Sequence, residues 1–239
     1  MPSAAGERCA PALGKAAAPL FRRETLQGKS RRARSIAARL AAAYPQVACP
    51  LAHKNTFELL VAVILSAQCA DAAVNKITPA LFSRYPNPAA LARAAVSDIE
   101  SVIRSLGLFR VKARSLKRCA QQLVDEFHGA VPSSMEELTR LAGVGRKTAN
   151  VIRGHAFDLP GIAVDTHCKR LSRRLGFTRR HEPLKIEQDL SRLLAPEERT
   201  RFSHRLILHG RAVCHARKPK CGKCVLRALC PSRDEDAGA

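Results

Sequence analysis

The chain has 239 residues, enough to bury a full core as one domain or as two small ones. Its 41 Lys and Arg residues against 20 Asp and Glu residues give a formal net charge of +21, which indicates a polyanionic partner. An anionic membrane surface would attract the same charge. Because the sequence has no run of about 18 apolar residues and no isolated basic amphipathic helix, nucleic acid is the better interpretation.

The N-terminal residues 1–29 mix Ala, Pro, Gly and Arg without a helical or alternating pattern, so we expect a disordered basic extension. Such an extension could grip phosphates, act as an organelle transit peptide or be a solvated tail. It lacks the apolar core of a secretory signal peptide. A reducing compartment is therefore expected for the nine cysteines of the chain.

Helical periodicity dominates the rest of the chain, and no stretch predicts a confident strand or an internal repeat. Capping boxes at Asn55 and Ser133, and Pro88 at a first helical position, mark the starts of several helices. The expected helices cover 30–44, Asn55 to near Cys69, a segment capped by Asp71 and kinked or divided at Pro79, a short helix from Pro88, 97–105, 110–128, 134–141, a helix from near Arg146, one from Thr166 ending at Gly176, one from Pro183, and 197–213. The fold class is therefore predicted to be all-α.

Two glycines, Gly143 and Gly145, separate the helix at 134–141 from the helix that starts near Arg146. A Gly-x-Gly turn between helices can take positive φ and turns the first N–H groups of the second helix toward an anion. The turn therefore predicts a phosphate-binding site. A lone Gly-x-Gly is otherwise an ordinary turn between packed helices.

Lys147 falls in the first turn of the second helix, where the helix dipole disfavours an ammonium. A free lysine is almost wholly protonated at neutral pH, so an amine nucleophile needs burial, the dipole or a nearby base. Asp165 could supply the facing carboxylate. Its ordinary role would be the N-cap of the helix that begins at Thr166.

Four of the nine cysteines are spaced C-x6-C-x2-C-x5-C within 17 residues. They are Cys214, Cys221, Cys224 and Cys230. Four thiolates suit either Zn²⁺ or a [4Fe–4S] cluster, but structural zinc usually uses two separate C-x2-4-C pairs and this run has one, so the spacing favours iron and sulfur. The scattered remainder is interpreted as small apolar residues. These are Cys9, Cys49, Cys69, Cys119 and Cys168.

Three motifs resemble bacterial endonuclease III of the helix-hairpin-helix DNA glycosylases, with similarity from about residue 30 to residue 230. They are Leu-Ala-Gly-Val-Gly-Arg-Lys-Thr-Ala-Asn at 141–150, Ile-Ala-Val-Asp-Thr-His at 162–167 and Leu-Ile-Leu-His-Gly-Arg at 206–211. The resemblance implies a [4Fe–4S] cluster on the four spaced cysteines, a sugar-attacking nucleophile at Lys147 and an assisting carboxylate at Asp165. One departure is Ala142, which stands where relatives often carry proline.

The same resemblance implies two helical lobes with DNA across the cleft between them. One is a six-helix barrel with the helix-hairpin-helix at residues 49–160. The other is a discontinuous iron-sulfur cluster domain made of residues 30–48 and 161–239.

The residues expected to contact DNA fall into three groups. Gln68 and Leu108 match family positions that enter the duplex, although Leu108 could instead be a core leucine at a loop edge. The hairpin region supplies Gly143, Val144, Gly145, Arg146, Thr148 and His167. The loop between the first two cluster cysteines supplies Arg217, Lys218 and Lys220, unless it is only a solvated basic loop.

We therefore expect a bifunctional DNA glycosylase and AP lyase that excises oxidised pyrimidines from double-stranded DNA in base excision repair, and that also acts on abasic sites. Extruding the base costs about a few kcal/mol. Lys147 would then attack C1′, expel the base and form a Schiff base, and β-elimination would cut the strand. Asp165 would accept a proton or stabilise the charge on the sugar. A cytoplasmic, nucleoid-associated monomer without membrane contact is expected.

Two other functions stay open from the sequence. A monofunctional adenine glycosylase of the same superfamily typically lacks the lysine and carries an extra C-terminal domain, whereas this sequence has Lys147 and ends at Ala239. A non-catalytic, metal-stapled DNA-binding module would share the charge and the cysteines. Borohydride reduction with abasic DNA separates the lyase from both, because only the lyase is trapped covalently.

Overall fold

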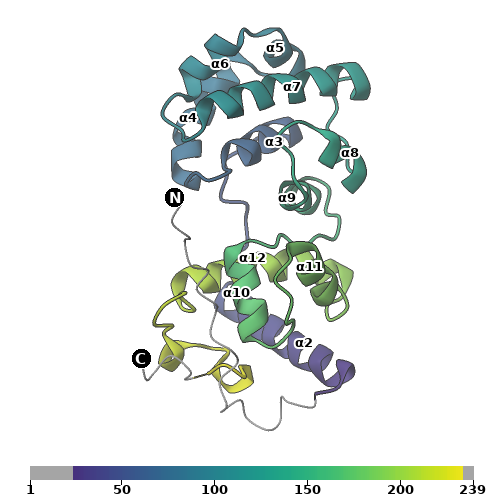
Figure 1. The fold of residues 1–239 in the computed structure, drawn as a ribbon, viewed down its shortest axis with the longest axis vertical. Coiled ribbons are helices and arrows are strands. Elements are labelled where there is room, and N and C mark those ends of the chain that lie inside the picture. Colours follow the sequence, from purple (N-terminus) through teal and green to yellow (C-terminus); the bar gives the residue numbers. More distant parts are fainter. Residues whose placement is uncertain (1–23, 234–239) are drawn as a thin grey trace, which may run out of the picture. The chain divides into compact units, whose positions relative to one another are not determined.

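The computed structural model describes residues 24–233, and within them every regular element is a helix (Figure 1). The predicted all-α class is confirmed. The chain divides into two compact units: unit 1 takes its described residues from Met1–Pro45, Thr166–Leu194 and Arg205–Ala239, and unit 2 consists of Gln46–Asp165 and Ala195–His204. None of the described helices is long and apolar enough to cross a membrane.

The α-helices of this part of the chain are α2 (Leu26–Ala43), α3 (Thr56–Leu65), α4 (Asp71–Arg84), α5 (Pro88–Arg93), α6 (Val96–Ile103), α7 (Phe109–Phe127), α8 (Met135–Arg140), α9 (Arg146–Ala156), α10 (Thr166–Arg174), α11 (Pro183–Ser191) and α12 (Arg199–Ala212). Short 3-10 turns lie at Pro196–Glu198, Cys221–Lys223 and Arg227–Leu229. The expected helices are all present, with their ends shifted by a few residues.

Unit 2 is built around α3, in which every residue from Phe57 to Leu65 is buried. A helix that is apolar all round has no solvent face and must be enclosed by other elements. Helices α4, α7 and α9 pack against it. Its start is like a capping box, as expected: Asn55 Oδ1 accepts from the Glu58 N–H at 2.9 Å, and Glu58 Oε2 reaches back to the Lys54 N–H, one residue before the cap, at 2.7 Å.

Helix α4 corrects two expectations. It runs unbroken through Pro79, so the predicted division is wrong. An internal proline costs about 3 kcal/mol or more, and the burial of Val74, Thr78 and Leu81 on either side offsets that cost. Asp71 is the first residue of the helix and not its cap: the N-cap is Ala70, without a side-chain hydrogen bond, so the carboxylate meets the helix dipole from the first turn.

Two other helix starts differ from the expectation. The cap of α8 is Ser134, one residue after the predicted Ser133, and its hydroxyl accepts from the Glu137 N–H at 3.1 Å. Helix α2 begins at Leu26, where residues up to 29 were expected to be disordered. Thr25 caps it by accepting from the Gly28 N–H at 3.1 Å, a start signal that the preceding Ala- and Arg-rich composition obscured. The rest of the expected extension lies outside the described residues.

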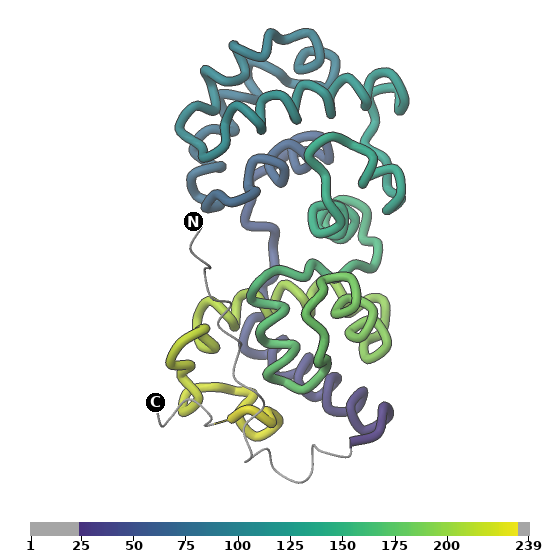
Figure 2. The backbone as a smooth tube through the Cα atoms, in the orientation of Figure 1, coloured from purple at the N-terminus to yellow at the C-terminus, as the bar shows by residue number. Residues whose placement is uncertain are grey.

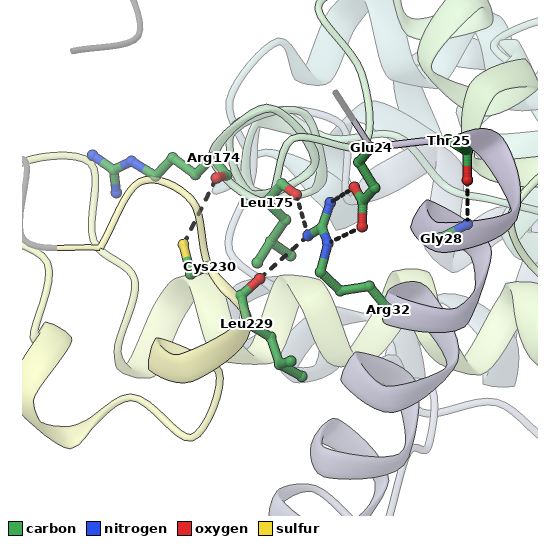
Figure 3. Close-up of polar contacts among 8 residues, drawn as sticks. All are labelled: Glu24, Thr25, Gly28, Arg32, Arg174, Leu175, Leu229 and Cys230. Atoms are coloured by element: carbon green, nitrogen blue, oxygen red, sulfur yellow. Dashed lines mark hydrogen bonds and ion pairs between the residues drawn. The ribbon is translucent and has the colours of Figure 1, made fainter. Parts of the chain in front are cut away.

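Unit 1 brings α2 beside segments from the far end of the sequence (Figure 2). Arg32 makes two of the hydrogen bonds in this connection (Figure 3). Its guanidinium pairs with both carboxylate oxygens of Glu24 at 2.9 and 2.7 Å and donates to the carbonyl oxygens of Leu175 and Leu229 at 2.7 and 3.2 Å. The Arg32 side chain is 7% exposed. A planar guanidinium group with several fixed N–H donors is suited to joining three chain segments at one point.

Replacing Arg32 with Met should lower the free energy of unfolding by about 3–5 kcal/mol, because it leaves Glu24 and two carbonyl groups without their donor. Urea unfolding of the cluster-loaded protein measures the change. Arg31→Met is the matched control, since Arg31 is exposed on the same helix. Coincident unfolding curves for the two variants would contradict the structural role of Arg32.

Candidate functional site

The predicted helix hairpin is present between α8 and α9, and its first glycine is required by geometry. Gly143 has φ +81°, and a Cβ there would lie 3.1 Å from Ser115 Cβ and 3.2 Å from Ile64 Cγ2. Gly145 instead has extended backbone, with φ −93° and ψ 173°, and is the N-cap of α9. Only Gly143 therefore uses the positive φ expected of the turn. A Cβ at Gly145 would meet no atom within 4 Å, so the backbone at the start of α9 faces open space.

The Ala142 departure is compensated by a glutamine on α7. Gln122 Oε1 accepts from the Ala142 N–H at 2.8 Å, and Gln122 Nε2 donates to the carbonyl of Arg140 at 3.1 Å. A proline at 142 would have no N–H to give. The hairpin entry is therefore fixed by a side-chain clamp in place of a rigid ring.

Lys147 is exposed in the first turn of α9, directly after the hairpin. Within the described part of the chain no hydrogen bond or ion pair engages its amine. Arg146 beside it is also exposed, Thr148 is half-buried and Val144 is buried, with 6% exposed. The hairpin thus carries two exposed cationic side chains at the start of α9 and is anchored by the buried Val144.

The segment that ends at Asp165 is held along α9 by Asn150. This asparagine is 2% exposed, and its Nδ2 donates to the carbonyl of Ile162 at 3.1 Å. Gly161 makes the approach possible, because a Cβ there would lie 2.8 Å from Asn150 Oδ1. Asn150 is one turn beyond Lys147 on the same helix. A single buried amide therefore joins the helix of one predicted catalytic residue to the segment carrying the other.

Gln68 and Leu108 occupy two exposed turns with left-handed backbone. Their φ values are 56° and 58°, which non-glycine residues rarely adopt. Leu108 is 56% exposed, so its alternative interpretation as a core leucine is wrong; Leu106 takes the core position. Cys69 and Gly107, the neighbours of the two residues, lie together, with the thiol 3.9 Å from the Gly107 carbonyl oxygen. The two turns are therefore adjacent.

A lysine and a cysteine form a hydrogen bond next to these turns. Lys112 on α7 is 5% exposed, and its Nζ donates to Cys69 Sγ at 2.9 Å. This corrects the interpretation of Cys69 as a small apolar residue, whereas Cys119 and Cys168 are buried as expected. Cys49 is half-buried, and burial raises its pKa. The Cys69–Lys112 contact was invisible in the sequence because its members are 43 positions apart.

The four spaced cysteines line one cavity in unit 1, together with Arg174 and Arg227. Burial and the neighbouring thiols raise the pKa of Cys230 to about 12, and burial first and then those neighbours raise the pKa of Cys224. Four thiolates at such close quarters repel one another unless a metal centre offsets their charge. The donor set and its enclosure fit a Cys₄-held iron-sulfur cluster.

Two arginines on α10, one turn apart, hold the start of this cysteine segment. Arg170 donates to the Cys214 carbonyl at 2.8 Å and to that of Gly210 at 3.0 Å. Arg174 donates to Cys214 Sγ at 3.4 Å and to the His215 and Ala216 carbonyls at 2.6 and 3.0 Å. Sequence reasoning missed both, although their i, i+4 spacing before a cysteine run places two cations on one helix face.

The basic loop between the first two cysteines is thereby fixed at its base. Its three predicted DNA contacts are exposed; they are Arg217, Lys218 and Lys220. Lys218 has φ 50°, and the Lys220 N–H closes the loop by donating to the Val213 carbonyl at 3.0 Å. His167, the remaining predicted contact, lies in the first turn of α10, where its Nδ1 is 3.1 Å from a guanidinium nitrogen of Arg170.

The hairpin and the cysteine loop are the two regions that family models match. Residues 61–196 match the HhH-GPD superfamily base excision DNA repair protein model, and residues 214–230 match the iron-sulfur binding domain of endonuclease III. The second match begins at Cys214 and ends at Cys230.

Similar proteins agree with both matches. The endonuclease III of Synechocystis sp. is 51% identical over 208 residues, which cover 87% of this chain and 95% of that protein, and that of Bacillus subtilis is 43% identical over 188 residues, covering 78% and 86%. A non-covalent endonuclease III–DNA complex matches with a TM-score of 0.83 at 42% identity, over 88% of this chain and 99% of the other. A trapped endonuclease III–DNA covalent intermediate matches with a TM-score of 0.82 at 43% identity, covering 86% and 97%.

The chain therefore belongs to the HhH-GPD superfamily of base excision DNA repair proteins, and within it to the endonuclease III family. The predicted family is confirmed. The predicted [4Fe–4S] cluster is confirmed as well, over the zinc alternative, by the match to the iron-sulfur domain.

The Cys69–Lys112 contact yields a prediction on stability. Cys69→Ala should lower the free energy of unfolding by about 1–3 kcal/mol, because it leaves a buried amine without its acceptor. Adding Lys112→Met should restore most of the loss, so the two changes should be strongly non-additive in urea unfolding. Cys119→Ala is the control for removing a buried thiol alone. Additive single and double changes would mean that the contact contributes nothing.

Proposed function

We propose that this enzyme, a DNA glycosylase and AP lyase of base excision repair, uses Lys147 as its nucleophile and Asp165 as the assisting carboxylate, and that it excises oxidised pyrimidines. One observation carries the proposal: Lys147 lies in the first turn after a glycine hairpin, and Asn150 ties its helix to the segment ending at Asp165. The trapped covalent complex of a similar endonuclease III with DNA supports a nucleophile that bonds to the substrate.

In the proposed reaction the damaged base is extruded from the duplex, since the sugar carbon cannot be reached within the stack. The Lys147 amine bonds to C1′ as the C1′–N bond breaks, and the base departs with one of the two amine protons. The C1′–O4′ bond then breaks, O4′ takes the second amine proton, and the Schiff base forms. Removal of a C2′ proton then breaks the C3′–O bond, which cuts the strand on its 3′ side. Asp165 takes up a proton from the amine or stabilises charge on the sugar.

The hairpin would hold the DNA backbone. The start of α9 lies at the positive end of the helix dipole, so it favours a phosphate. Arg146 adds a cationic side chain there, and His167 at the start of α10 is a further proposed DNA contact. The basic loop, fixed by Arg174, offers Arg217, Lys218 and Lys220 to further phosphates with little loss of conformational entropy.

The proposal assigns separate work to the two predicted domains. Residues 49–160 carry the hairpin and the duplex-entering turns, and residues 30–48 with 161–239 carry the cluster. The cluster would be held by Cys214, Cys221, Cys224 and Cys230. When bound it supplies a cross-link that fixes the 214–230 segment, since metal binding energy is folding energy for a segment with few apolar side chains. A cytoplasmic, nucleoid-associated monomer stays a prediction.

Lys147→Gln should abolish both borohydride trapping on abasic DNA and strand cleavage, because no amine remains to form the Schiff base. DNA binding should be largely kept, since other cations make most phosphate contacts. Gel analysis of trapped product and a binding titration measure the two effects. Lys76→Gln, which removes an exposed lysine from α4, should trap like the wild type. Undiminished trapping by Lys147→Gln would exclude this lysine as the nucleophile.

Gln68 and Leu108 should fill the space that the extruded base leaves, so their truncation should matter most where opening costs most. Single-turnover excision by Gln68→Ala and Leu108→Ala is compared on a lesion in a paired duplex and on the same lesion opposite a missing nucleotide. The mutant-to-wild-type ratio should be markedly lower on the paired duplex, where unstacking costs about a few kcal/mol. Leu184→Ala, another exposed leucine, is the control. Equal losses on both substrates would exclude the wedge role.

A further inference from the structure

His209 on α12 is a buried histidine that neither base excision nor cluster ligation uses. It is 1% exposed, and both of its ring nitrogens have partners within unit 1. Nδ1 lies 3.0 Å from the Tyr44 hydroxyl, and Nε2 lies 3.3 Å from Cys224 Sγ. The Tyr44 and His209 rings meet edge to face, with centroids 5.9 Å apart at 77°. A continuous chain of hydrogen bonds therefore runs from Tyr44 to a proposed cluster ligand.

The chemistry of the three groups fixes the direction of this chain. A ligating thiolate only accepts, so Nε2 must carry the imidazole proton and donate it to sulfur. The other nitrogen of a neutral imidazole is then an acceptor, and the tyrosine hydroxyl is its donor. Tyr44 O–H donates to Nδ1, and Nε2–H donates to Cys224. The thiolate thereby selects the histidine tautomer, and the Tyr44 hydroxyl donates to the ring nitrogen that is left as an acceptor.

Tyr44 and His209 are each held in place through their backbone groups. Tyr44 caps α2, with its N–H donating to the Leu40 carbonyl at 2.8 Å, and its own carbonyl accepts from Arg205 Nε at 3.1 Å. The His209 carbonyl accepts from the Cys214 N–H at 2.9 Å. His209 therefore contacts two of the four proposed ligands, one through its ring and one through its backbone.

We propose that Tyr44 and His209 form a hydrogen-bond relay that sets the reduction potential of the [4Fe–4S] cluster through Cys224. A donated N–H withdraws negative charge from the thiolate and so stabilises the more electron-rich, reduced state, which raises the potential. His209 is a positioning residue in this role, acting on the ligand and not on DNA. The inference concerns the cofactor and is independent of the assignment of Lys147.

The test compares cluster-loaded variants at His209 and Tyr44. His209→Met fills similar space without a donor and should lower the midpoint potential, and it should remove the deuterium sensitivity of one Fe–S stretching band in resonance Raman spectra. His209→Gln places an amide N–H near the Nε2 position and should return the potential toward the wild-type value. Tyr44→Phe should lower it by less than His209→Met, since the N–H···S bond survives but is no longer strengthened by a donor at Nδ1.

The chain offers a matched control because it has two tyrosines. Tyr85 lies in unit 2, its buried hydroxyl has no hydrogen-bond partner among the described residues, and Tyr85→Phe should leave the potential and the spectrum unchanged. Protein-film voltammetry and iron content per chain are measured for every variant. A wild-type potential in both His209→Met and Tyr44→Phe would overturn the relay. If His209→Met does not load a cluster, a wild-type potential in Tyr44→Phe alone would overturn it.

Discussion

Helix α3 has no polar face, and the need to enclose it determines how unit 2 is built. Its burial from Phe57 to Leu65 requires α4, α7 and α9 to pack around it. The functional features follow from that packing. The Gly143 turn lies against Ile64 of α3, and the chain leaves α3 directly into the strained turn that carries Gln68. One apolar helix thus positions both the hairpin proposed to bind phosphate and one of the proposed duplex-entering residues.

Unit 1 is held together less by an apolar helix than unit 2 is, and more by polar contacts from side chains to the backbone. Arg32, Arg170 and Arg174 each donate to two or more carbonyl oxygens in segments distant in sequence. The 214–230 segment has only short 3-10 turns and one buried apolar side chain, Leu226, so these hydrogen bonds and the cluster replace a core. Such a segment has few apolar contacts to hold it once the cluster is lost, because the thiols then reprotonate and their cross-link disappears.

The left-handed backbone at Gln68 and Leu108 is unfavourable in conformational free energy, and the surrounding structure holds both residues in it. Non-glycine residues in such conformations persist only where their neighbours over-determine them. Here the neighbours are Cys69, Gly107 and Lys112. The Cys69 thiol contacts the Gly107 carbonyl oxygen and accepts from the buried Lys112 amine, and these contacts hold the two turns together. The arrangement leaves both tips exposed and prearranged, so the proposed entry into DNA would cost little conformational entropy.

The sequence by itself determined the all-α class, most helix limits, the hairpin and the four-cysteine loop, because each depends on periodicity, caps or spacing within a few residues. Short-range signals also failed locally: Pro79 did not divide α4, and the start of α2 was missed. Only the tertiary structure decided the Gln122–Ala142 clamp, the exposure of Leu108, the Cys69–Lys112 contact, the Asn150 tie and the Tyr44–His209–Cys224 chain. Most of these join residues 12 to 165 positions apart, and a contact of that kind arises only when the packing of whole helices brings two side chains together.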